Sequence, residues 1–364
     1  MYKIMKTYPI LLLAVLSLAF SACKVDFSPN AKWKDVPVVY CVLDPQEDTV
    51  FARVQHCYLA EDNLYNYSQI FDSNNYAQGS IQVFLSAWNG STSSTSITPN
   101  SVKVAEWELE YTLRNGKPDG AFSNSPQPVY YCVPGKNFLS ANENYMYQLV
   151  VLNTQTHDTM AQAVTNMVGF RPVDLTTPAD TEYILDSHNG IKGRHYGFKP
   201  VSRGELRWLT LPHARMYQPV VLFYYRKGHD TLSVRIEGTA VKDQRNSTKL
   251  SSYSINENRF LNTIAAALAD NEDSLFNVNY VDIYIYACNE DLNSYITTRN
   301  LRLTSGQEYV PYTNVDGGQG IFGSRRTHLY HRVPCDSAGQ AGNLPERLTR
   351  LGVGFYGDFG QNSR

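Results

Sequence analysis

The sequence predicts an all-β protein built from two β-sandwiches and one packed α-helix. Short runs of β-branched and aromatic residues alternate with turns rich in Pro, Asp, Asn and Gly, as strands and hairpins require. The chain of 364 residues contains 26 Tyr, 15 Phe and 4 Trp, and these residue types favour strands. A helical spacing of apolar residues is clear in one stretch, so helices are expected to be few.

The first domain is expected over residues 36–172. A β-rich run at 36–43, a Pro/Asp turn at 44–48 and a second run at 49–55 together predict a hairpin. Further strands are expected at 81–88, 103–113, 129–133, 147–152 and from 159 onward. Seven short strands separated by turn signals are typical of an immunoglobulin-like or transthyretin-like sandwich.

The second domain is expected over residues 173–364 and is again a β-domain. Its strands are predicted at 205–212, 220–225, 231–236 and 278–287. The exception is a predicted helix at 257–270, which Asn256 or Asn258 can cap. Its apolar residues recur with helical spacing and are Phe260, Leu261, Ile264, Ala265 and Leu268. A closing segment ends the domain, with a short helix expected from Asn343 to Gly352.

The N-terminus predicts export and a lipid anchor. Lys3 and Lys6 precede an apolar run at 10–20, the pattern of a signal peptide, and this run is too short to span a bilayer. The following Ser21-Ala22-Cys23 resembles a bacterial lipoprotein signal. We therefore expect residues 1–22 to be removed, Cys23 to be lipidated with palmitate-type chains, and residues 23–35 to form a tether. An ordinary signal peptide with an incidental Cys23 is the alternative.

Charge and cysteine content narrow the class of protein further. The formal net charge of −2 disfavours binding to a polyanion, so no nucleic-acid partner is predicted. Apart from Cys23, the odd number of remaining cysteines leaves at least one thiol unpaired in an envelope that permits disulfides. We expect buried structural cysteines, with one or two disulfides left open, among Cys41, Cys57, Cys132, Cys288 and Cys335.

The glycine-rich segment TNVDGGQGIFGSRR at 313–326 could suggest a phosphate-binding loop. It lacks the Lys that such a loop needs, and its flanks read as strand rather than as strand followed by helix. Nucleotide binding is therefore not predicted, and neither is any other cofactor. The glycines are expected to permit a tight turn that closes the fold.

Two histidines and two acidic clusters are the candidates for a metal site in the sequence. His328 and His331 are three residues apart, so on a strand they would point to opposite faces and could not share an ion. The acidic clusters at 44–48 and 289–293 lack the ligand rhythm of a calcium loop and are interpreted as solvated turns. No metal-binding or catalytic residues are predicted.

Aromatic residues beside polar loops could form a stacking platform for sugars or peptides, although amphipathic strands explain them equally well. The residues considered are Tyr65, Tyr67, Tyr76 and Trp88.

Several segments together with Cys23 resemble a Bacteroidota lipoprotein family of unknown function. These segments are PVVYCVLDPQEDTVFARVQHCYL (37–59), LRWLTLPHARMYQPVVLFYY (206–225), NEDLNSYI (289–296) and YTNVDGGQGIFGSRR (312–326). The resemblance implies an outer-membrane lipoprotein with an N-terminal immunoglobulin-like domain and a second β-domain. It carries over no catalytic residues. Lys24-Val25-Asp26 loosely resembles the residues that follow the lipid cysteine in surface-exported members, which favours the cell surface over a periplasm-facing location.

Three functions remain open. The leading hypothesis is a non-enzymatic binding or assembly factor that is lipid-anchored in the outer envelope and has an outer-membrane protein or a glycan as partner. The alternatives are an accessory lipoprotein of an outer-membrane transporter or secretion complex, and a hydrolase with an interdomain cleft. A deep pocket lined by His and Asp would favour the hydrolase, whereas a shallow, Tyr-rich surface would favour binding.

Overall fold

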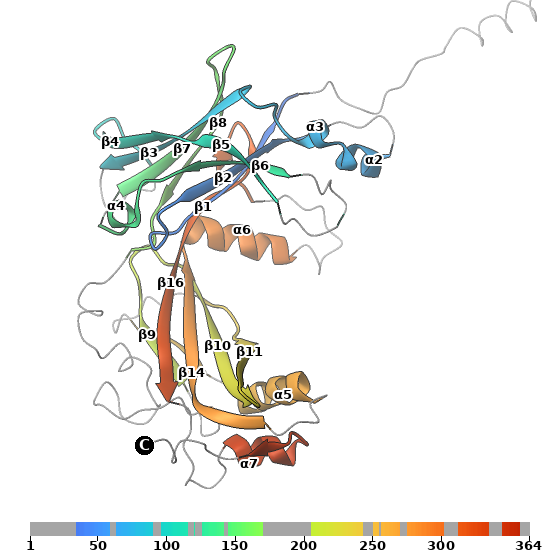
Figure 1. Ribbon diagram of the computed structural model, residues 1–364. Helices are drawn as coiled ribbons and strands as arrows, with labels where there is room; N and C mark the ends of the chain where they lie inside the picture. The colour runs from blue at the N-terminus through green and yellow to red at the C-terminus, as the bar shows by residue number, and fades with distance from the viewer. Residues whose placement is uncertain are drawn as a thin grey trace, which may run out of the picture.

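The protein is mostly β, with packed sheets, which confirms the predicted all-β sandwich-type fold class (Figure 1). Figure 1 shows a computed structural model. The residues that it describes are 34–58, 63–89, 96–115, 120, 126–141, 145–169, 205–242, 250–254, 256–269, 275–301, 312–334 and 344–356.

The N-terminal lobe is a sandwich of two five-stranded layers. One layer has the order β15-β8-β7-β3-β4, and the other has the order β16-β1-β2-β6-β5. The strands of the first layer are β15 (Val315–Asp316), β8 (Thr159–Asn166), β7 (Tyr145–Asn153), β3 (Ile81–Asn89) and β4 (Val102–Glu108). Those of the second are β16 (Gln319–Pro334), β1 (Pro37–Leu43), β2 (Val50–His56), β6 (Gln127–Cys132) and β5 (Glu110–Arg114).

Alternation of apolar residues places the core between these two layers. Val83 and Leu85 of β3 are fully buried, and they pack in one cluster with Val39 and Cys41 of β1. Successive strand residues point to opposite faces, so every second residue of β1 and of the first part of β3 enters this core.

The long strand β16 belongs to both lobes. Its first half pairs in parallel with β1, from Val38↔Gln319 to Leu43↔Ser324. Its second half pairs antiparallel with β14 (Leu275–Cys288), from Cys288↔Arg325 to Tyr280↔Pro334. The result is one ten-stranded sheet, whose main path is β11-β10-β14-β16-β1-β2-β6-β5. Residues 315–324 thus pair with the N-terminal strands, although the sequence analysis placed them in a separate second domain at 173–364.

The C-terminal lobe is built on the other half of this sheet. Its strands are β10 (Met216–Lys227), β11 (Asp230–Glu237), β12 (Val241–Lys242), β14 and β17 (Phe355–Tyr356), with β9 (Glu205–Leu209) and β13 (Leu250–Ser254) in a separate pair. The helix α5 (Glu257–Leu268) covers one face of the lobe's sheet, where Phe260 and Ile264 pack in a cluster with Phe223 and Ile283. This is the lobe's core.

Both helices predicted in the second domain are present. Asn256 caps α5, because its Oδ1 accepts a hydrogen bond from the backbone N–H of Arg259 at 2.9 Å. The short helix α7 (Leu344–Arg350) is followed by Gly352, which has φ +84°. An ion pair between Arg347 and Glu257 joins the two helices.

The prediction of a single packed helix with a short closing helix is incomplete. Four further helices are α2 (Leu64–Gln69), α3 (Phe71–Asn74), α4 (Lys136–Ala141) and α6 (Glu290–Leu301). Three of these helices are shorter than two turns. The fourth, α6, has apolar residues with no helical stripe, so its periodicity gave no signal. The sequence does indicate where α6 begins. Asn289 can cap the helix, and acidic residues such as Glu290 and Asp291 are favoured in a first helical turn.

The strand predicted at 103–113 is two strands in different layers. Leu109 lies between them, with a buried side chain and a backbone N–H that donates to the carbonyl of Val83 at 2.8 Å. Before Leu109 the chain pairs with β3, and after it the chain pairs with β6. The chain therefore crosses from one layer to the other at this residue.

The glycine-rich segment is a turn between the two layers. Gly317 has φ +75°, and the chain passes from β15 in one layer to β16 in the other at this point. Gly320 has φ +113°, and a Cβ there would lie 1.9 Å from the carbonyl oxygen of Val39. Only glycine lets β16 approach β1 this closely. The predicted role of these glycines in closing the fold is confirmed.

We expect Gly320→Ala to lower the free energy of unfolding by about 3 kcal/mol or more, because it adds backbone strain to a clash that rigid strands cannot relieve. Gly354→Ala is the matched control. A Cβ at Gly354 meets nothing within 4 Å, so its effect should stay below about 1 kcal/mol. Urea unfolding followed by Trp fluorescence measures both, and equal midpoints for the two variants would contradict the close-approach argument.

A fragment of residues 24–172 is expected not to fold cooperatively. It lacks β15 and the first half of β16, so each layer of the N-terminal sandwich loses an edge strand and part of the shared core becomes exposed. Circular dichroism during thermal unfolding, with residues 24–364 as the reference, measures this. A sharp transition in the fragment, near that of the reference, would show that the strands from 315–324 are dispensable.

Candidate functional site

The two lobes meet at a buried cluster of polar side chains centred on Asn289, which is 0 % exposed. Its Nδ2 donates to Thr165 Oγ1 at 2.7 Å and to Asn166 Oδ1 at 3.1 Å, while its Oδ1 accepts from the backbone N–H of Ser324 at 3.2 Å. Ser324 Oγ in turn donates to the carbonyl of Asn166 at 2.7 Å. These contacts tie the end of β8 to the start of α6 and to β16.

A carboxylate completes this cluster. Asp291 accepts hydrogen bonds from Thr165 Oγ1 at 2.9 Å and from Tyr312 Oη at 2.9 Å. Burial raises the pKa of Asp291, with a smaller contribution from the neighbouring Glu290, while the bonds from Thr165 and Tyr312 oppose that rise. Because the polar groups satisfy one another, we assign the cluster to holding the lobes together rather than to chemistry.

Asn289→Ala should destabilise the protein by about 2–4 kcal/mol, because it leaves buried donors and acceptors without partners. Asn258→Ala, on the exposed side of α5, is the matched control and should change little. Chemical unfolding measured by circular dichroism tests the difference. Similar losses of stability in the two variants would show that the cluster does not stabilise the junction between the lobes.

The two histidines considered as metal ligands lie on opposite faces of β16, as strand alternation predicts. His331 Nδ1 lies 3.0 Å from Asp282 Oδ1. The ring of His328 instead contacts Tyr330, a core residue, with ring centroids 4.4 Å apart. Among the described residues, no group of three or more His, Cys, Asp and Glu side chains is placed to hold a metal ion.

The acidic clusters are only partly the solvated turns that the sequence suggested. Asp44 is buried, and its Oδ2 accepts from Arg325 Nε at 3.0 Å. Asp48 Oδ1 accepts from the backbone N–H of Lys136 at 3.0 Å. In the second cluster, Asn289 is fully buried. Several of these residues therefore hold loops and helices in place, which strand and turn patterns alone could not show.

The aromatic residues first considered do not form a platform. Tyr76 is buried and donates from its hydroxyl to Asp35 Oδ1 at 2.8 Å, which also fixes the end of the predicted tether. Tyr65 is 57 % exposed on α2, and Tyr67 stacks on Tyr58 with centroids 6.3 Å apart. Because Tyr76 is inside the core, the stacking hypothesis fails for this set.

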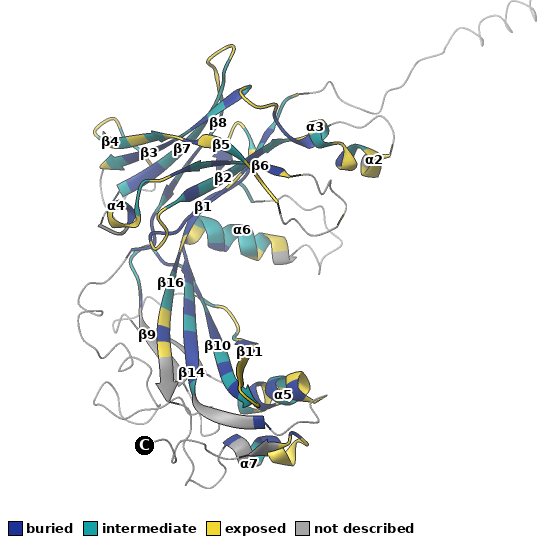
Figure 2. Cartoon of the chain, viewed as in Figure 1, coloured by how far each residue is buried: buried dark blue, intermediate teal, exposed yellow. Residues whose placement is uncertain are grey.

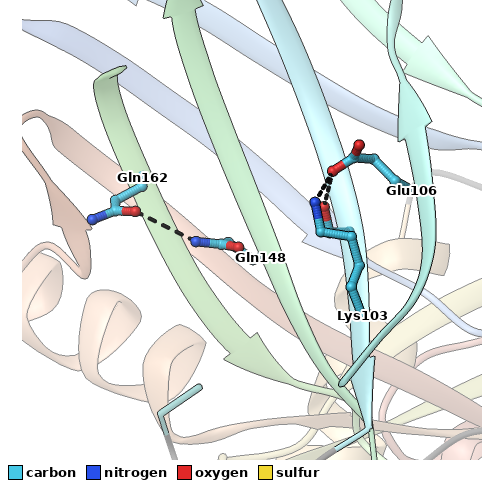
Figure 3. Close-up of polar contacts among 5 residues, drawn as sticks. Lys103, Glu106, Gln148 and Gln162 are labelled. Carbon is cyan, nitrogen blue, oxygen red and sulfur yellow. Dashed lines mark hydrogen bonds and ion pairs between the residues drawn. The ribbon is translucent and has the colours of Figure 1, made fainter. Parts of the chain in front are cut away.

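Trp88 lies beside a polar row on the outer face of the β15-β4 layer. Lys103 Nζ lies 5.3 Å from the centre of the Trp88 ring and pairs with Glu106. Figure 3 shows this pair and, on the neighbouring strands, the hydrogen bond from Gln148 Nε2 to Gln162 Oε1 at 3.4 Å. The four polar side chains form two pairs, and the ammonium of Lys103 lies beside the indole of Trp88.

The four described cysteines outside the predicted tether are free thiols. Cys41, Cys132 and Cys288 are buried, as predicted, and burial raises the pKa of each thiol, to about 12 for Cys132 and Cys288. Cys57 is exposed. The lipidation candidate Cys23 and the remaining Cys335 lie outside the described residues.

A cluster that the sequence analysis missed lies on the C-terminal lobe, on the sheet face opposite α5. We call it the tyrosine face, and it consists of Tyr224, Tyr280, Tyr284 and Tyr286. The β14 residues Val281, Ile283, Ile285 and Ala287 point into the core, so the tyrosines between them point to the other face. Figure 2 shows buried and half-buried residues alternating along β14. All four tyrosines are half-buried.

The rings of the tyrosine face form two contacting pairs. Tyr284 and Tyr286 are nearly parallel, with an interplanar angle of 10° and centroids 5.9 Å apart. Tyr224 and Tyr280 are tilted by 42°, with centroids 5.2 Å apart. Leu329, which pairs with Tyr284 across the sheet, is 42 % exposed. The face is therefore an apolar and aromatic strip on the surface of the sheet.

Fixed polar groups lie within and beside this strip. Asp282 is 3 % exposed, and its Oδ2 accepts from Tyr224 Oη at 2.9 Å while His331 contacts it from β16. Burial and the bond to Asp282 raise the pKa of Tyr224 to about 12. At the rim, Arg235 Nε lies 2.9 Å from Glu237 Oε1. Bonding to Glu237 and to Tyr286 raises the pKa of Arg235, so it stays charged.

No protein-family model and no curated protein match the chain. Within the part of the chain that the structure describes, no helix combines the length and apolar character needed to cross a bilayer.

Proposed function

We propose that this protein is a lipid-anchored, non-enzymatic binding or assembly protein of the bacterial outer envelope. The observation that carries the binding role is the tyrosine face, since a strip of half-buried aromatic rings suits contact with a partner. A hydrolase would need a nucleophile beside the Asp282–His331 pair. In the described residues, His331 Nδ1 lies 3.0 Å from Asp282 Oδ1, and the buried Asp282 also accepts a hydrogen bond from Tyr224 Oη.

The anchor rests on the N-terminal sequence. Lys3, Lys6, the apolar run at 10–20 and Ser21-Ala22-Cys23 support a signal peptide ending at a lipidated cysteine. Several acyl chains on Cys23 hold a protein on a membrane far more firmly than one chain does. The resemblance to the Bacteroidota lipoproteins supports the outer membrane and the cell surface as its location.

Cys23→Ala is expected to abolish incorporation of radiolabelled palmitate and to move the protein from the membrane fraction to the soluble fraction. Cys57→Ala is the matched control, since it removes an exposed cysteine without touching the lipoprotein signal, and it should remain labelled and membrane-bound. Fractionation of cells expressing each variant measures this. A Cys23→Ala protein that stays in the membrane fraction would refute the lipid anchor.

A further inference from the structure

Several charged side chains on the tyrosine face and along its strands have partners within the protein. Arg235 pairs with Glu237, and His331 Nδ1 lies 3.0 Å from Asp282 Oδ1. Farther along β16, Arg325 pairs with Asp44 at 3.0 Å. Paired charges cancel beyond a few ångströms, so the face presents little net field to an approaching molecule. Such a face has no electrostatic preference for an anionic lipid surface, a nucleic acid or a strongly charged peptide.

We propose that the tyrosine face binds a neutral glycan, an inference that rests on the binding function proposed above. The apolar faces of sugar rings pack on aromatic side chains, and the Tyr284 and Tyr286 rings offer two such surfaces in succession along β14. Successive residues on one strand face lie roughly 6–7 Å apart, so the two rings suit consecutive sugars of one chain.

The polar side chains at the rims of the tyrosine face also suit a ligand with many hydroxyl groups. Arg235 at one rim and His331 at the other have half or more of their side chains exposed, at 50 % and 62 %. Each is held by a carboxylate, so its remaining N–H or ring nitrogen is oriented at the edge of the aromatic strip. Sugar hydroxyl groups both donate and accept hydrogen bonds, and they can use these groups together with the tyrosine hydroxyls.

The geometry also favours an extended ligand over a small one. The tyrosines lie on one face of the sheet and come from two neighbouring strands, with Leu329 on a third. A single sugar would cover only one ring, whereas a chain of several sugars covers the strip and buries correspondingly more apolar surface. Affinity is therefore expected to rise with the number of sugars.

The test uses the full chain with Cys23→Ala, which is soluble if the anchor is as proposed and is otherwise purified in detergent. Native gels cast with neutral polysaccharides (glucans, xylans, mannans and galactans) measure retardation, and calorimetry with hexasaccharides of the retarding polymer measures affinity. We expect at least one neutral polymer to retard the protein. Tyr284→Ala and Tyr286→Ala should each weaken hexasaccharide binding about tenfold or more, because each removes one stacking surface.

Two controls separate ring stacking from loss of structure. Tyr284→Phe keeps the ring and should bind within about threefold of the parent, since its hydroxyl is expected to contribute only one exposed hydrogen bond. Tyr65→Ala removes an exposed tyrosine of the other lobe and should bind like the parent. Unfolding midpoints measured for every variant show that the fold is intact.

Four outcomes would overturn the glycan proposal. They are no retardation by any neutral polymer, equal binding after Tyr284→Ala and Tyr286→Ala, preference for anionic polymers such as polygalacturonate, and self-association through this face detected by sedimentation. The wider binding function would survive these results if crosslinking in cells still attached an envelope protein to the parent. It would fail together with the glycan proposal if neither glycans nor any envelope protein bound.

Discussion

The close approach of β16 to β1 is the constraint on which the rest of the architecture depends. Their parallel pairing requires Gly320 to lie against the carbonyl of Val39, where no side chain fits. Once this contact forms, the same strand continues into the C-terminal lobe and pairs with β14. One strand therefore closes the first sandwich and forms the central strand of a sheet that runs through both lobes (Figure 1).

The buried polar cluster gives this connection a fixed geometry. A strand alone can bend and twist where it leaves one lobe for the other. The bonds of Asn289 to Thr165, Asn166 and Ser324 oppose such bending, because each alternative orientation would leave buried polar groups without partners. The cluster thus orients the C-terminal sheet, and with it the tyrosine face, relative to the N-terminal lobe.

The tyrosine face could have been predicted in part from the sequence. Residues 280–287 alternate strictly between aromatic or acidic and aliphatic residues, which indicates a strand with one aromatic face. The contribution of Tyr224 and His331 could not be predicted, because it depends on which strands neighbour β14 and in which register. Tyr76 lies close to polar loops in the sequence but is buried in the structure, because loop position says little about which way a side chain points.

Local chemistry in the sequence was enough to predict most strands, the capped helix α5 and the structural role of the glycine-rich turn. These features follow from short-range steric and hydrogen-bonding preferences that act within a few residues. The tertiary structure alone decided that residues 315–324 complete the N-terminal sandwich, that Leu109 divides one apparent strand between two layers, and that Asn289 is a buried junction. Each of these depends on contacts between residues far apart in the chain, and a pattern read along one strand does not specify its partner.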